Sequence, residues 1–196
     1  ERNWDTALQG FERAVSEDPT FVFPYYEIQR LAAVTNQREK RDRAFQSLMQ
    51  NLYKLPDRQQ YLIKSAYYAF KGDREKQIAV LKMMVELSPE DLAGHGELAN
   101  LHATAGRWDE ALAELERILE IDPGRKNVLL AIGSLLQQKG EFGKALESYE
   151  KYAAQFPEDM KSFALAGDLY RTMGDFERAK ASLKKALIID PENVSV

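Results

Sequence analysis

The chain of 196 residues contains no cysteine. This absence excludes a disulfide framework, a thiolate metal site and a cysteine nucleophile, but it does not fix the cellular compartment. Long hydrophobic runs are missing as well, since the longest uncharged stretch in the middle of the chain is the twelve-residue run Asn127 to Gln138. A membrane-spanning helix needs about 20 apolar residues, so this run predicts a buried helix and no membrane insertion. No signal peptide is recognisable. The compartment of this soluble chain stays unknown, with the cytoplasm slightly favoured over the periplasm.

An excess of basic charge is also lacking. The chain carries 27 Lys and Arg against 31 Asp and Glu, a formal net charge of −4. Residues 92–125 alone hold seven acidic and three basic side chains, so the whole negative excess lies there. The basic run Arg38 to Arg43 is interrupted by Glu39 and Asp42 and is expected to be a solvated junction between a loop and a helix. With no basic face to neutralise phosphates, we expect no nucleic-acid partner.

What the chain does contain is an eighteen-residue segment that returns at a constant interval. Each copy begins with a glycine and ends with a proline, and successive copies are 34 residues apart: Gly72 to Pro89, Gly106 to Pro123, Gly140 to Pro157, and Gly174 to Pro191. A fixed period of this size indicates a repeat architecture. Apolar residues recur at helical spacing before and after the glycine, and the proline ends the second block, so each copy predicts a helical hairpin. Asp73 and Asp175 are placed to cap the second helix.

Two columns of small residues run through the aligned copies. The eighth position holds Ser65, Ala99, Gly133 and Gly167, and the twentieth holds Ala111, Ala145 and Ala179. Small side chains let the two helices of a hairpin approach closely, while larger residues at the fourth, eleventh and twenty-fourth positions interlock around them. One hairpin cannot bury both of its apolar sides, so the copies are expected to stack on one another.

This 34-residue pattern resembles the tetratricopeptide repeat (TPR) family. The resemblance implies an all-α, right-handed solenoid forming a single array over residues 1–196. Copies 92–125, 126–159 and 160–193 match well, whereas copy 58–91 departs at Lys64 and Gln77. Residues 20–57 resemble a divergent copy whose three extra residues are expected in the loop around Gln37 to Arg41. Residues 1–19 match a second helix alone, a half repeat.

Residues 18–31 and 55–89 are similar to repeat regions that follow kinase, cyclase or DNA-binding modules in bacterial signalling proteins. The chain starts at Glu1 rather than Met, inside a half repeat, so it is expected to be a piece of a longer protein.

The sequence offers few residues that could carry catalysis. His95 and His102 are seven residues apart, about 10 Å along a helix, which is too far for them to share one metal ion. Both occupy columns that hold large core residues in other copies, so they are expected to be packed. Carboxylates cluster on the second helix of copy 92–125 and are expected to face solvent: Asp109, Glu110, Glu114, Glu116, Glu120 and Asp122. No phosphate loop, nucleophile elbow or HExxH motif occurs, so we predict no enzyme, no cofactor and no metal.

The resemblance implies a scaffold that acts by binding a partner protein. In such arrays the first helices line a concave groove, which receives an extended or helical segment of the partner. The second, fifth, ninth and twelfth positions of each copy are predicted to line it: Gln59, Leu62, Ala66 and Ala69; Ala93, Gly96, Asn100 and Ala103; Asn127, Leu130, Ser134 and Gln137; Lys161, Ala164, Asp168 and Arg171. Of the carboxylate clamp that some family members use for acidic tails, only Asn100 and Lys161 are present. An apolar or amphipathic ligand is therefore expected.

Two alternatives stay open. Uncovered apolar helix faces at the two ends would favour self-association. A regulatory role on an attached signalling module would follow from the second resemblance.

Overall fold

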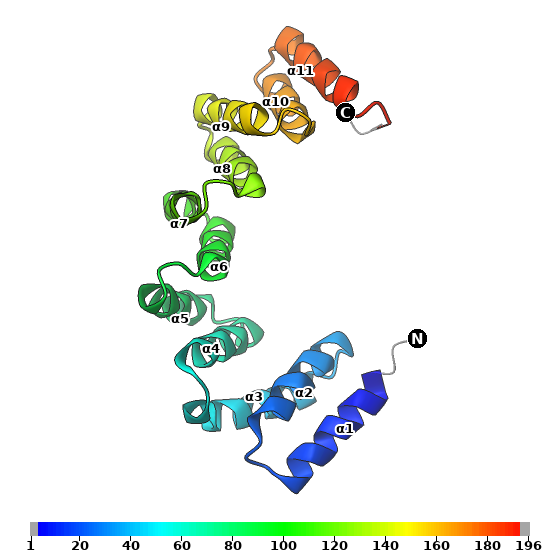
Figure 1. Ribbon diagram of the computed structural model, residues 1–196, viewed down its shortest axis with the longest axis vertical. Helices are drawn as coiled ribbons and strands as arrows, with labels where there is room; N and C mark the ends of the chain where they lie inside the picture. The colour runs from blue at the N-terminus through cyan, green and yellow to red at the C-terminus, as the bar shows by residue number, and fades with distance from the viewer. Residues whose placement is uncertain (1–3, 193–196) are drawn as a thin grey trace. The chain divides into compact units, whose positions relative to one another are not determined.

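The computed structural model describes residues 4–192, and within them the chain forms eleven α-helices and one short 3-10 helix without any β-strand (Figure 1). The elements are α1 (Trp4–Glu17), α2 (Val22–Val34), α3 (Arg38–Gln50), η1 (Leu52–Lys54), α4 (Asp57–Lys71), α5 (Arg74–Leu87), α6 (Leu92–Thr104), α7 (Trp108–Ile121), α8 (Lys126–Lys139), α9 (Phe142–Gln155), α10 (Lys161–Thr172) and α11 (Phe176–Ile189). The predicted all-α class is confirmed. No helix in this range is long and apolar enough to cross a membrane.

The helices pair as hairpins, with α2 against α3, α4 against α5, α6 against α7, α8 against α9, and α10 against α11. Four hairpin turns contain the repeated glycine with a positive φ, 75° at Gly72, 73° at Gly106, 86° at Gly140 and 80° at Gly174. Only glycine adopts this conformation without a steric cost, which explains why the residue returns every 34 positions.

The turn between α2 and α3 uses a different residue for the same purpose. Asn36 has a φ of 57° and occupies the place that glycine holds in the other turns. Asparagine tolerates the left-handed region better than other side chains, so the turn keeps its ordinary length, Thr35 to Gln37. The prediction that extra residues lie around Gln37 to Arg41 is therefore wrong. The additional chain lies after α3, where η1 (Leu52–Lys54) precedes α4.

Aspartates cap several helices as the sequence predicts. The carboxylate of Asp73 accepts the backbone N–H of Lys76 at 3.2 Å. The carboxylate of Asp175 accepts that of Arg178 at 3.1 Å. Such a side-chain acceptor satisfies one of the backbone donors that a helix N-terminus leaves without a partner.

The small residues lie where the two helices of a hairpin meet. A Cβ atom added to Gly133 would come within 2.7 Å of Cδ1 of Tyr149, and one added to Gly167 within 2.7 Å of Cγ of Leu183. In copy 58–91 the larger Gln77 takes the twentieth position, and its amide Nε2 lies 3.4 Å from the hydroxyl of Ser65. A small polar residue at the eighth position thus accommodates a large polar one at the twentieth.

The chain divides into two compact units, Glu1–Leu87 and Ser88–Val196. In the first unit, one apolar cluster includes Phe45 and Ile63, and a second includes Leu8 and Leu31. In the second unit, a continuous core runs through α6 to α10 and includes Leu115. These cores hold the exposed faces of the first helices in place.

Candidate functional site

The predicted groove residues all lie on first helices, on α4 in the first unit and on α6, α8 and α10 in the second. We call these exposed surfaces the first-helix faces. None of the predicted residues is fully buried. The exposed ones are Gln59, Ala69, Ala93, Asn100, Asn127, Lys161, Asp168 and Arg171, and the half-buried ones are Leu62, Ala66, Gly96, Ala103, Leu130, Ser134, Gln137 and Ala164. They are accessible, as a binding surface requires, and their role in binding stays a prediction.

A core tyrosine orients two polar groups on the first-helix face of α8. Tyr149 is only 1% exposed, and its hydroxyl donates to Oε1 of Gln137 at 3.2 Å. The same hydroxyl oxygen lies 3.5 Å from Oγ of Ser134. A tyrosine phenol is protonated at neutral pH and can donate, and burial raises the pKa of Tyr149 further in the same direction. The hydrogen bond from the core side therefore holds the amide of Gln137 in one orientation.

Two of the three charges on the first-helix face of α10, Arg171 and Asp168, pair with each other, while Lys161 is exposed at the start of the helix. Arg171 donates to Oδ1 of Asp168 at 2.9 Å, one helical turn away. Both side chains are more than half exposed, so this pair contributes little to stability. A ligand at the C-terminal end of α10 meets this pair, and the preference for apolar or amphipathic segments stays a prediction.

The two histidines are buried, His95 to 6% exposure and His102 to 1%. Nδ1 of His95 lies 2.6 Å from Oε2 of Glu114, and Nε2 lies 3.1 Å from the carbonyl oxygen of Pro89. The prediction that Glu114 faces solvent is therefore wrong, because its side chain reaches back across the α6–α7 hairpin and is only 20% exposed. Across residues 4–192, His, Asp and Glu form no cluster of three that could hold a metal ion.

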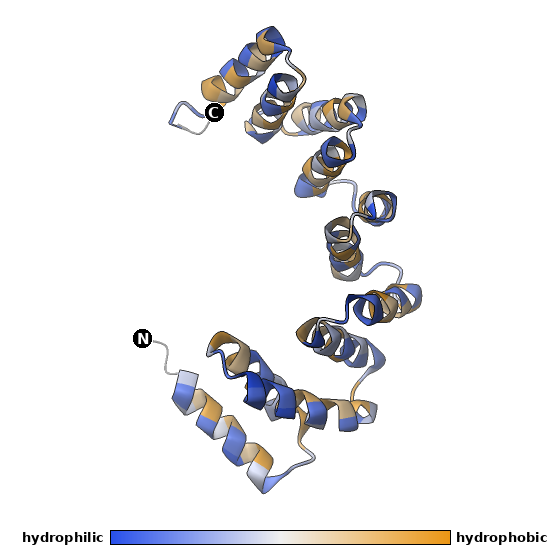
Figure 2. Ribbon diagram, turned by 180° about the vertical axis from the view of Figure 1, so that it is seen from behind, coloured by the Kyte–Doolittle hydropathy of each residue, from blue (hydrophilic) through white to orange (hydrophobic). Residues whose placement is uncertain are grey.

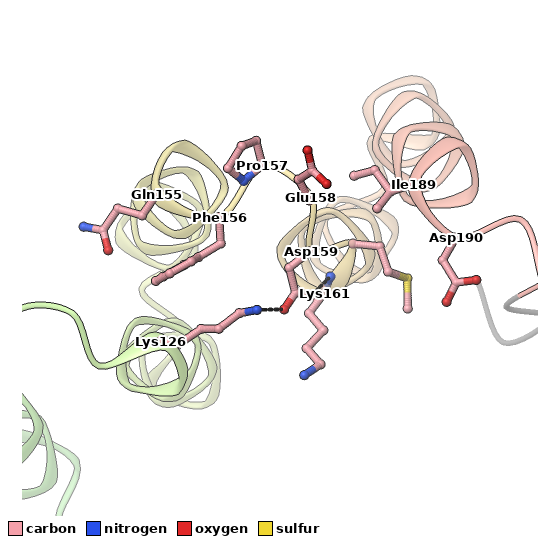
Figure 3. Close-up of a pocket in the computed structure, with 10 residues that line it drawn as sticks. Lys126, Gln155, Phe156, Pro157, Glu158, Asp159, Lys161, Ile189 and Asp190 are labelled. Atoms are coloured by element: carbon pink, nitrogen blue, oxygen red, sulfur yellow. Dashed lines mark hydrogen bonds and ion pairs between the residues drawn. The ribbon is translucent and has the colours of Figure 1, made fainter.

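A pocket of about 740 Å³ lies where copies 126–159 and 160–193 join (Figure 3). Its central group is Asp159, which accepts from Nζ of Lys126 at 2.8 Å, the hydroxyl of Tyr152 at 2.6 Å and the backbone N–H of Lys161 at 3.0 Å. Burial alone would raise the pKa of Asp159, but the bonds from Lys126, Tyr152 and Lys161 outweigh it and lower the pKa to about 2. Lys126 and Tyr152 belong to the same copy as Asp159 and Lys161 to the next, so this carboxylate holds the end of one copy and the start of the following helix together.

In the first unit, an apolar pocket of about 400 Å³ lies between α2 and α4. Sequence reasoning found its α4 side, Gln59 and Leu62, but missed the α2 side. There Phe23 is 56% exposed and Tyr26 is 42% exposed, which is unusual for residues of this size. The complete lining is Val22, Phe23, Tyr26, Leu55, Arg58, Gln59, Leu62 and Ile63. The sequence feature that could have indicated this side is the aromatic run Phe21 to Tyr26. One buried face of a helix cannot cover so many large residues in succession, so some of them must be exposed.

Family models described as tetratricopeptide repeat together match residues 72–158 and 161–193, more than half of the chain. One model covers residues 72–135, and another covers residues 127–158 and 161–193. BBSome complex member BBS4 from Bos taurus is 32% identical to this chain over 77 residues. That match includes 39% of this chain and 15% of the bovine protein, so the chain spans a small part of that relative's length.

Solved structures with a similar fold include the crystal structure of MamA protein. It has a TM-score of 0.68 and 20% sequence identity, covering 89% of this chain and 94% of that chain. Another is YrrB, described as a TPR protein with an unusual peptide-binding site. It has a TM-score of 0.63 and 20% identity, covering 93% of both chains. At this level of identity the likeness shows the fold alone.

Proposed function

This chain belongs to the tetratricopeptide repeat family, and we propose that it is a non-catalytic scaffold that holds a segment of a partner protein against its first-helix faces. The observation that carries the proposal is the placement of all predicted groove residues at exposed or half-buried positions on first helices. Well-packed hairpins behind these faces keep the surface ordered before a ligand arrives, which lowers the entropic cost of binding.

The side chains of the second unit's faces favour an apolar or amphipathic ligand segment. Small, aliphatic and amide groups predominate there, for example Ala93, Asn100 and Leu130. The charged pair on α10 is internally compensated. YrrB, whose description mentions a peptide-binding site, shows that a similar fold serves such a purpose elsewhere.

Selection of peptides from a displayed library against the 196-residue chain tests the proposal. Ala93→Arg places a long cation on the first-helix face of α6, whereas Ala113→Arg makes the same change at an exposed position of α7 in the same hairpin. Selected peptides should lose affinity for the Ala93 variant and keep it for the Ala113 variant. Equal losses in both variants, or a library that yields no binder, would count against binding by these faces.

Self-association is a second candidate, supported by the exposed apolar residues of α11. Ile188 is 79% exposed and Leu187 is 38% exposed. Figure 2 shows this end of α11 as strongly hydrophobic. Light scattering over a concentration series should then reveal a dimer or larger species that Ile188→Glu removes. A monomer at the highest concentration would eliminate this candidate.

A further inference from the structure

The first unit contains a surface between α2 and α4 with a pocket at each end, which we call the α2–α4 crevice. The apolar pocket around Phe23, Tyr26 and Leu62 lies at one end. A second pocket of about 270 Å³ lies at the other end, lined by Ala33 of α2, Ala69 and Phe70 of α4, and Arg38 and Arg41 of α3.

Cationic groups surround one aromatic ring at the second pocket. The guanidinium carbon of Arg41 lies 4.9 Å from the centre of the Phe70 ring, that of Arg38 lies 5.6 Å away, and Nζ of Lys71 lies 5.5 Å away. Contacts of this kind hold the flat guanidinium groups in place over the ring. The expectation that the run Arg38 to Arg43 is a solvated junction is thus wrong for Arg41, which is largely covered.

Only one of these three cations is neutralised by a carboxylate. Lys71 pairs with Asp42 at 2.5 Å, and this hydrogen bond raises the pKa of Lys71. Within residues 4–192, neither Arg38 nor Arg41 has a carboxylate partner, and Nε of Arg41 is buried without any hydrogen-bond acceptor. Two guanidinium groups without a carboxylate partner give this end of the crevice uncompensated positive charge, so it favours an incoming anion.

The apolar pocket at the other end of the crevice can accommodate a side chain of the ligand. Val22 and Ile63 form its buried floor, while the rings of Phe23 and Tyr26 stand at its exposed edge. The Phe23 ring packs edge-on against Phe11, with 6.2 Å between ring centres, which restrains its position. A pocket of this size and lining suits one bulky aliphatic or aromatic side chain.

The two pockets lie in register along one face. Tyr26 and Ala33 are seven residues apart on α2, and Leu62 and Ala69 are seven apart on α4, which corresponds to two helical turns, or about 10 Å. An extended peptide advances about 3.3 Å per residue, so about three residues connect the pockets. On α4 the small side chain of Ala66 lies between Leu62 and Ala69, and on α2 Arg30, which pairs with Glu27, lies between Tyr26 and Ala33.

The geometry points to a ligand class: a short extended peptide with a bulky apolar side chain and, three residues further along, a carboxylate. This inference rests on the proposed scaffold function and adds the chemistry that one unit recognises. Arg38 and Arg41 would bind the carboxylate through charge-assisted hydrogen bonds, and the Phe23 and Tyr26 end would cover the apolar side chain.

Titration of ¹⁵N-labelled protein by NMR, with synthetic peptides in a Ser/Gly background, tests the inference. The probe has Phe and Glu three residues apart, and matched peptides carry Gln for Glu or Ser for Phe. Arg38→Gln combined with Arg41→Gln should weaken binding of the probe at least about tenfold, the effect of losing hydrogen bonds to a charged group. Arg43→Gln removes one positive charge, against two in the double variant, from an exposed position of α3 and should change affinity less than about twofold.

The decisive result is the coupling between peptide and protein changes. Replacing Glu by Gln in the peptide should weaken its binding to the wild-type protein by the same factor of about ten. The same replacement should not weaken binding to the double arginine variant any further. Tyr26→Ser should weaken the Phe peptide and leave the Ser peptide unchanged. A further peptide ends three residues after Phe, so that its C-terminal carboxylate takes the place of the Glu side chain. Comparing its affinity with that of the C-terminally amidated peptide shows whether a chain end can supply the carboxylate.

Three results would overturn the inference: equal affinity of the Glu and Gln peptides, an equal loss in the Arg43 variant, or tight binding only when phosphoserine replaces Glu. If library-selected peptides bind the second unit while the crevice variants change nothing, the scaffold function stands and the crevice assignment fails. Retention of the helical circular dichroism spectrum shows that the double variant is folded.

Discussion

Replacement of Gly133 by alanine probes the contact on which the α8–α9 hairpin depends. The new Cβ would lie 2.7 Å from Cδ1 and 2.9 Å from Cζ of Tyr149, distances that real Cβ atoms essentially never show. Tyr149 is 1% exposed and its hydroxyl is bonded to Gln137, so moving the ring aside would disturb its packing and this hydrogen bond. Overpacking of this kind costs about 1–3 kcal/mol. The better helix propensity of alanine returns up to about 1 kcal/mol, so we expect a net loss of about 1–2 kcal/mol.

Urea unfolding followed by circular dichroism measures this loss as a lower midpoint with an unchanged slope. The matched control is Gly143→Ala in α9 of the same copy, since no other side chain in residues 4–192 lies within 4 Å of the added Cβ. That change should be neutral or stabilising by up to about 1 kcal/mol. If Gly133→Ala stabilises the protein as much as the control, the reasoning about close helix approach is refuted.

A second substitution should restore the lost stability. Copy 92–125 packs Ala99 with Leu115 at the same two positions, and both are buried. Gly133→Ala combined with Tyr149→Leu recreates that pair, so the double variant should show a favourable coupling energy between neighbouring sites. Additive losses would mean that Tyr149 is not the residue that Gly133 accommodates.

Three further predictions concern other parts of the chain. Native-state hydrogen exchange should find the slowest amides within residues 92–193, where the apolar core is continuous, and a slowest set within residues 1–57 would contradict this. Because the pKa of Asp159 is lowered to about 2, its stabilising bonds are fully present above about pH 4 and lost as the pH falls through 2. Asp159→Asn should therefore melt lower at pH 7 and show a smaller decrease between pH 4 and 2; an unchanged acid profile would show that Asp159 is not responsible. An acidic tail peptide without an apolar anchor should bind wild type and Lys161→Ala equally weakly by fluorescence anisotropy, and micromolar binding lost in Lys161→Ala would disprove the absence of a carboxylate clamp.

The hairpins were predictable because each depends on short-range rules. A positive φ requires glycine, and a helix start requires a capping oxygen, so Gly72 and Asp175 reveal their roles from spacing alone. Asn36 was not recognised, because asparagine enters the left-handed region only with the help of its surroundings. The extra residues around η1 were consequently assigned to the wrong end of α3.

The candidate site was predictable only in part. Repeat register placed Gln59 and Leu62 on an exposed face, because register determines which side of a helix is covered. Register does not reveal which long side chains cross from one helix to another. The hydrogen bond between His95 and Glu114 and the stacking of Arg41 on Phe70 depend on such long side chains, and both became evident only from the structure.

The ion pair at the C-terminal junction joins the two ends of a single copy. Lys126 is the first residue of copy 126–159 and Asp159 is its last, and their side chains lie 2.8 Å apart. If this copy were duplicated or moved into another array, the ion pair between its first and last residues would be kept. In copy 92–125 the terminal Arg125 instead pairs with Asp122 in the same loop, at 3.3 Å. Copy 126–159 is therefore the better unit for building longer repeat arrays from this sequence, because both partners of its terminal ion pair lie within it.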